Sequence, residues 1–155
     1  MAATNQIVKP RSGGSGPQAT GLAMLRIALG IFFVALSVTK MAWYADSGIL
    51  AKQLSGWLSS AGPISRWYLE TVAIPWVGVW ARLVPLGELA TGVAFLTGAW
   101  TRTAASLALL MVLSIHIAGG ALFQWRFLTN GYGPPVLGGL LALALGGKKL
   151  PLSLR

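Results

Sequence analysis

Four long stretches of apolar residues, separated by shorter polar segments, form the main pattern along the chain. They cover about residues 21–42, 75–99, 103–123 and 132–147. A helix needs about 20 apolar residues to cross the hydrocarbon core of a bilayer, so the first three stretches are long enough and the last is short. A thinner bilayer, or a contribution from the loop that begins at Leu128, would accommodate the last one. The pattern predicts an all-α membrane protein, a bundle of four transmembrane helices.

The segment between the first two stretches, residues 48–74, has a different pattern. Apolar residues recur there at helical spacing, while polar residues fall on the opposite face, and Gly62-Pro63 interrupts the pattern once. Such a segment has one face for lipid or protein and one for water. We therefore predict one or two short amphipathic helices that lie in the membrane interface. Outside the helical region, 21–147, we expect a flexible polar tail at 1–20 and a basic tail at 148–155.

The composition agrees with a membrane protein. Hydrophobic residues make up 55% of the chain and charged residues 10%, too few to cover a water-facing surface. The 12 Lys and Arg against 3 Asp and Glu would suggest a nucleic-acid partner in a soluble protein. Here, however, the basic residues stand singly at the ends of apolar stretches, where they orient membrane proteins. We therefore expect the lipid bilayer, and no nucleic acid, as a partner.

The distribution of basic residues favours an orientation with both termini inside. The inner side would then carry Lys9, Arg11, Arg102, Lys148, Lys149 and Arg155. The outer loops would carry only Lys52, Arg66 and Arg126. Because positive residues concentrate on the cytoplasmic side, the chain is predicted to be multi-pass, N-in and C-in.

Glu88 is an acidic residue within the apolar sequence "VPLGELATG". At 1.5 Å rise per residue, Glu88 and His116 both reach the middle of the membrane, so we expect them to face each other. A carboxylate at this depth needs a partner or a proton, and Arg82 and Arg26 are candidates one layer away. The pair either handles protons or joins two helices structurally, and both interpretations stay open.

The first stretch carries a polar stripe that begins at Arg26 and continues through Ser37 and Lys40. Arg26, Lys40 and Arg82 are therefore candidates for ligand binding, although each can also extend to the interface as an anchor. Without cysteine, the chain has no disulfide, iron–sulfur cluster or covalently attached haem. With a single histidine and dispersed acids, we expect no metal site, so any redox chemistry needs a diffusible cofactor.

The sequences "LRIALGIFF", followed by "TK", and "ARLVPLGELATGVAFLTGAWTRTAA" resemble the DoxX/DoxD-like family of small four-helix bacterial membrane proteins. "LTNGYG", before the last stretch, is a looser match. The family includes the membrane subunit of thiosulfate:quinone oxidoreductases. By this resemblance, Arg26, Lys40, Glu88 and Arg102 correspond to recurring charged residues of the family, and Arg102 joins Arg26, Lys40 and Arg82 as a candidate for ligand binding.

The resemblance implies a subunit of a redox complex in the cytoplasmic (inner) membrane of a bacterium. Electrons would pass from a reduced sulfur substrate or a partner to quinone, whose carbonyls Arg or His would bind while Glu88 relays protons. Other membrane subunits would be partners. Two alternatives remain: a non-catalytic accessory subunit of a larger respiratory or photosynthetic complex, and a small transporter, for which an internal repeat is expected.

Overall fold

The computed structural model describes residues 16–148 and 150–153. In this part of the chain all regular secondary structure is helical, and short turns and loops connect the helices. The α-helices are α1 (Pro17–Thr39), α2 (Met41–Ala45), α3 (Ser47–Leu58), α4 (Pro63–Tyr68), α5 (Val77–Thr97), α6 (Thr101–Ala118) and α7 (Pro134–Gly146). A π-helical segment, η1 (Leu69–Ala73), continues α4, and two 3-10 segments, η2 (Ala121–Phe123) and η3 (Trp125–Thr129), connect α6 to α7.

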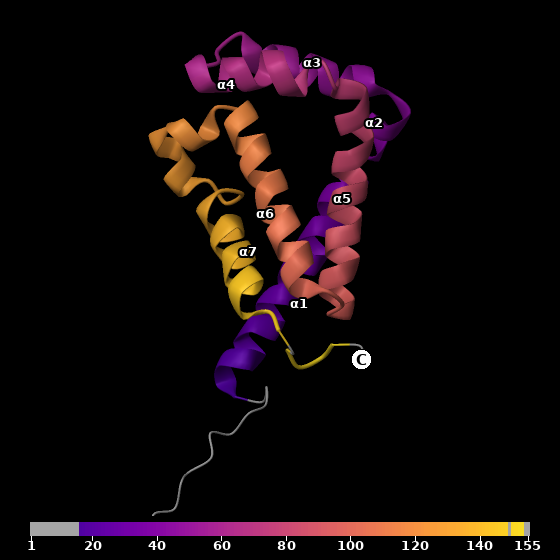
Figure 1. Ribbon diagram of the computed structural model, residues 1–155, viewed down its shortest axis with the longest axis vertical. Helices are drawn as coiled ribbons and strands as arrows, with labels where there is room; N and C mark the ends of the chain where they lie inside the picture. The colour runs from indigo at the N-terminus through magenta and orange to yellow at the C-terminus, as the bar shows by residue number, and fades with distance from the viewer. Residues whose placement is uncertain (1–15, 149, 154–155) are drawn as a thin grey trace, which may run out of the picture.

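The helices α1, α5, α6 and α7 form a bundle, and α3 and α4 lie across one end of it (Figure 1). We call residues 47–73 the cap and this end of the bundle the cap end. The described C-terminal residues, 150–153, and the N-terminal part of α1 lie at the opposite end (Figure 1). Helices α1, α5 and α6 are long and apolar enough to cross a membrane, and α7 is a shorter apolar helix. The predicted all-α membrane bundle with an amphipathic segment between its first two long helices is confirmed.

The helix ends differ from the predicted ones for local reasons. Helix α1 begins at Pro17 rather than residue 21, because a proline in the first turn is compatible with helix geometry. The third helix ends at Ala118, not 123, because Gly120 adopts a left-handed φ of 67° that stops the helix. The predicted N-terminal tail lies outside the described residues up to residue 15.

Two apolar clusters hold the molecule together. The larger one joins the four bundle helices around Phe33, Phe95, Leu140 and Leu143, all fully buried. The smaller one lies under the cap and consists of Leu50, Leu54, Leu69, Ala73, Ala81 and Ala118. The cap is therefore packed onto the ends of α5 and α6 through its own apolar face.

Candidate functional site

An ion pair between Lys40 and Glu88 lies at the centre of the candidate site. Glu88 is on α5 and is 1% exposed, while Lys40 directly follows α1, and its side chain is 18% exposed. Lys40 Nζ donates a hydrogen bond to Glu88 Oε1. The pair forms because α1 packs along α5 in the most extensive helix contact of the bundle. A carboxylate inside an apolar bundle thus has the neutralising partner that its burial requires.

The predicted pairing of Glu88 with His116 is wrong. His116 is also buried, but its Nδ1 lies 2.8 Å from the carbonyl oxygen of Val112 on its own helix. Because a carbonyl only accepts, Nδ1 carries the proton in the neutral ring. The ring meets Phe127 edge-on at 5.4 Å between centroids. Equal depth in the membrane therefore does not bring the two side chains together.

Two buried oxygen atoms near the ion pair are left without hydrogen bonds. Glu88 Oε2 and Ser37 Oγ have no partner within the described part of the chain. Ser37 lies about one turn before Lys40 and belongs to the same polar stripe of α1. Buried polar atoms are normally satisfied by protein or by ordered water. Glu88 thus retains a free lone pair that can accept a proton or a water molecule.

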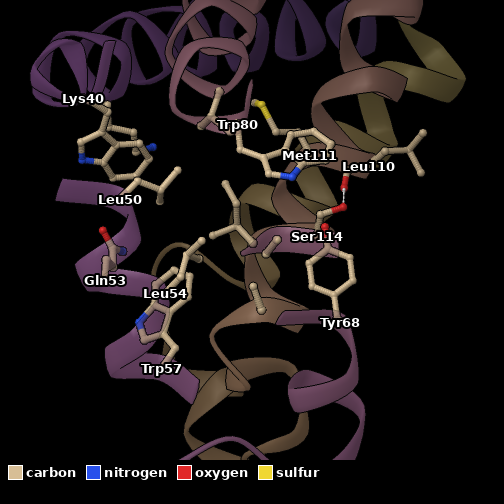
Figure 2. A pocket seen from close by; sticks show the side chains of 15 residues that line it. Lys40, Leu50, Gln53, Leu54, Trp57, Tyr68, Trp80, Leu110, Met111 and Ser114 are labelled. Atoms are coloured by element: carbon tan, nitrogen blue, oxygen red, sulfur yellow. Dashed lines mark hydrogen bonds between the residues drawn. The ribbon is translucent and has the colours of Figure 1, made fainter. Parts of the chain in front are cut away.

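A cavity of about 400 Å³ opens beneath the cap, and Lys40 lies in its wall (Figure 2). Its walls come from α2 and the cap on one side and from α5 and α6 on the other. Most of the lining is apolar or aromatic, with Trp43, Trp57, Tyr68 and Trp80 as its large rings. Lys40 Nζ lies 5.6 Å from the centroid of the Trp43 ring. An apolar pocket with a few polar groups is the usual form of a small-molecule site.

The polar groups of the cavity lie on two opposite sides. Lys40 and Gln53 are on one side, and Tyr68 and Ser114 are on the other (Figure 2). The Ser114 hydroxyl donates to the Leu110 carbonyl. Neither the Gln53 amide nor the Tyr68 hydroxyl has a hydrogen-bond partner among the described residues, so both remain available as donors. The cavity thus offers hydrogen-bond donors from two directions to a flat ligand between them.

The three arginines predicted as ligand-binding residues lie elsewhere. Arg26 is completely buried at the end opposite the cap, where Nη1 donates to Ser153 Oγ at 2.6 Å and Nη2 to the Leu152 carbonyl at 2.7 Å. Arg102 Nε donates to the Ala144 carbonyl on α7 at 2.8 Å. Both residues join segments of the fold, and neither lines the cavity.

Arg82 lies on the outside of α5, where its Nη1 donates to the Gly78 carbonyl at 2.7 Å. The expectation that it lies near Glu88 is wrong. Six positions along an α-helix correspond to about 240° around its axis, so the two side chains leave α5 on different faces. Of the four residues predicted to bind a ligand, Lys40 is the one in the wall of the cavity.

A comparison with protein-family models matches residues 21–121 to DoxX. The match covers more than half of the chain, from α1 to the start of η2, and includes Lys40, Glu88 and the cap. The chain belongs to the DoxX family. Neither the curated proteins nor the solved structures that were searched gave a match.

The DoxX match confirms the family resemblance, and the structure adds residues that the sequence pattern did not single out as a site. Gln53, Tyr68 and Trp80 line the cavity together with Lys40. The helical spacing of residues 48–74 reveals the apolar face of the cap, but it does not say whether that face meets lipid or the bundle. The long gap between α1 and α5 in this DoxX protein therefore contributes one wall of the candidate site.

Proposed function

We propose that this DoxX-family protein is a quinone-interacting subunit of a membrane redox complex, and that the quinone ring binds in the cavity beneath the cap. The observation that supports the proposal is the cavity itself, which has aromatic walls and hydrogen-bond donors on two opposite sides. A quinone headgroup is a flat apolar ring with a carbonyl acceptor at each end. The cavity volume, about 400 Å³, is within the range of small-ligand sites.

The donors have distinct roles in this proposal. Lys40 and Gln53 bind one carbonyl, the Tyr68 hydroxyl binds the other, and the indole rings hold the faces of the headgroup. Quinone supplies the redox chemistry, since it accepts two electrons and two protons. Glu88 lies behind Lys40: after the Lys40 ammonium group gives a proton to the reduced quinone, Glu88 takes up a proton from water and passes it to the neutral amine through their hydrogen bond. The electrons come from a partner or a reduced sulfur substrate, because this chain contains no cysteine to supply a redox-active thiol.

Binding can be tested with the native tryptophans of the cavity as reporters. We expect quinone to quench their fluorescence in the purified protein, and Lys40→Met to weaken binding by about tenfold or more, since a hydrogen bond from a charged group is lost. Lys52→Met is the matched control, because Lys52 is an exposed cap lysine that does not line the cavity. Equal affinities of the two variants would contradict the proposal.

Proton transfer needs a separate variant. Glu88→Gln keeps the size and a hydrogen-bond acceptor for Lys40 but removes the ability to exchange a proton, so we expect quinone reduction by the complex to be abolished while the protein stays folded. Thermal unfolding followed by circular dichroism checks the fold. If Glu88→Gln retains full activity and only lowers the unfolding temperature, the ion pair serves to join α1 to α5.

A second candidate, an accessory subunit without its own ligand, is favoured by the short helix α7. Its 13 residues extend about 20 Å, less than the roughly 30 Å hydrocarbon core, and irregular segments η2 and η3 precede it. Irregular backbone at membrane depth is tolerated where protein covers it, which a neighbouring subunit beside α7 would do. Native purification followed by mass spectrometry distinguishes the candidates: bound quinone supports the first, and partners without quinone support the second.

A further inference from the structure

A second hollow lies beside the cavity, in the surface between α5 and α6. We call it the α5–α6 groove, and its volume is about 300 Å³. Its walls are made largely of small residues, Gly87, Ala90 and Ala94 on α5 and Ala104 and Ala108 on α6. Where α1 and α5 meet, small residues bring two helices into direct contact, whereas here they leave a channel open between the helices.

The groove and the cavity share a wall residue. Met111 lines both hollows, and a Cβ atom added to Gly87 would lie 3.4 Å from its Sδ. On α6, the lining continues from Ser114 in the cavity through Met111 to Thr103 at the far end of the groove. Ser114 lies eleven positions after Thr103, which corresponds to about 17 Å along the helix axis. The two hollows therefore follow one another along a single seam, with a flexible thioether between them.

Thr91 presents to the groove a hydroxyl without a protein partner among the described residues. Thr91 is 6% exposed and lines the groove, yet its hydroxyl has no hydrogen-bond partner in the described part of the chain. A threonine inside a helix commonly donates to the carbonyl one turn earlier, as Thr97 does to Val93. The π electrons of a carbon–carbon double bond can accept a weak hydrogen bond from such a hydroxyl, whereas a saturated chain cannot.

From the shared Met111 wall and the unpartnered Thr91 hydroxyl, we infer that the α5–α6 groove holds the isoprenoid tail of the ligand whose headgroup lies in the cavity. The inference rests on the proposed quinone site and specifies its ligand as a long-tailed, lipid-soluble quinone. The head lies at the cap end, and the tail follows the seam toward the middle of the membrane. Met111 moves aside for the first part of the tail, since its side chain has several rotatable bonds.

The test compares a long-tailed isoprenoid quinone with a tail-less benzoquinone analogue in protein reconstituted into nanodiscs. Ala90→Phe fills the groove, and Val93→Phe is the matched control because Val93 is exposed on the same helix and lines neither hollow. Lipid is as apolar as the groove, so the tail gains mainly packing contacts, and we expect Ala90→Phe to weaken long-tail binding by about fivefold. Binding of the tail-less analogue should stay unchanged in both variants.

The possible outcomes distinguish a failure of the tail site from a failure of the quinone site itself. If Ala90→Phe weakens both ligands equally or neither of them, the groove does not hold the tail, although the headgroup site stands. If the unmodified protein binds neither quinone, the proposed function and the inference both fail. Thr91→Val tests the hydroxyl with almost the same side-chain volume, and it should remove any preference for an isoprenoid tail over a saturated tail of equal length. A preference that survives in Thr91→Val would contradict the role of Thr91.

Discussion

At the scale of single residues, the main feature of this protein is a buried ion pair, Lys40–Glu88, inside an apolar helix bundle. The buried carboxylate of Glu88 is neutralised by Lys40, which approaches from the end of α1. Removing one member of a buried ion pair leaves the other charge without a partner, which costs more than replacing both by apolar groups. The pair thus couples the wall of the cavity to the stability of the bundle.

A double-mutant cycle measures this coupling. We expect Lys40→Met alone to lower the free energy of unfolding by about 3 kcal/mol, because Glu88 is left buried and unpaired. Lys40→Met combined with Glu88→Met should be closer to the unmodified protein, since no charge remains. Denaturant unfolding in micelles gives the values, and Glu70→Gln, which breaks the exposed Arg66–Glu70 pair, is the control with an effect of at most about 1 kcal/mol. Equal losses in the single and the double variant would contradict the coupling.

Sequence reasoning located Glu88 but not its partner. The spacing along α5 gives the depth of Glu88 in the membrane, because rise per residue is a property of the helix alone. The partner depends on which helix packs against that face of α5. Sequence reasoning favoured His116, with Arg82 and Arg26 one layer away, and did not consider Lys40, which is the partner in the structure. Local periodicity therefore predicts positions along an element more reliably than contacts between elements.

At the scale of elements, the close contact between α1 and α5 requires a glycine at position 92 of α5. A Cβ atom added to Gly92 would lie 2.6 Å from Val34 Cγ2 and 2.9 Å from the Val34 backbone nitrogen, so any side chain there separates the helices. Gly138 on α7, in contrast, has no atom within 4 Å of such a Cβ. Glycine is therefore required for close helix packing at position 92, whereas at position 138 there is room for a side chain.

The two glycines make a matched pair of substitutions. Gly92→Ala should destabilise the protein by about 1–3 kcal/mol through overpacking, whereas Gly138→Ala should stabilise it by about 0.5 kcal/mol because alanine favours the helix. Unfolding temperatures in the same detergent provide the comparison. Similar shifts for both substitutions would mean that α1 and α5 separate at little cost.

At the level of elements, the apolar stretches predicted the long helices well, and the amphipathic spacing predicted the cap. The ends of α1 and α6 differ, because they depend on Pro17 and Gly120 rather than on hydrophobicity. The cavity was not predictable, since it arises where the cap meets α5 and α6, and its walls come from segments far apart in the sequence. A cavity of this kind requires the three-dimensional packing of those segments.

For the whole molecule, the cap lies at one end and the described C-terminal residues at the other (Figure 1). Because the chain has no cysteine, single cysteines can report the orientation of the two ends. If the termini are cytoplasmic, Ser59→Cys in the cap should react with a membrane-impermeant maleimide in intact cells, and Lys148→Cys only after permeabilisation. Both residues are exposed, so burial does not confound the measurement. The opposite pattern of labelling would reverse the predicted orientation.

The contacts of Arg26 link the first helix to the end of the chain. Its guanidinium is bound by Leu152 and Ser153, which are more than 120 residues later in the sequence. Ribosomes make a chain from its N-terminus, so Arg26 enters the membrane long before these partners exist. During synthesis its guanidinium has to stay in contact with water until Leu152 and Ser153 emerge and bind it. Chains that stop before Leu152 therefore retain a buried arginine without these two hydrogen-bond partners.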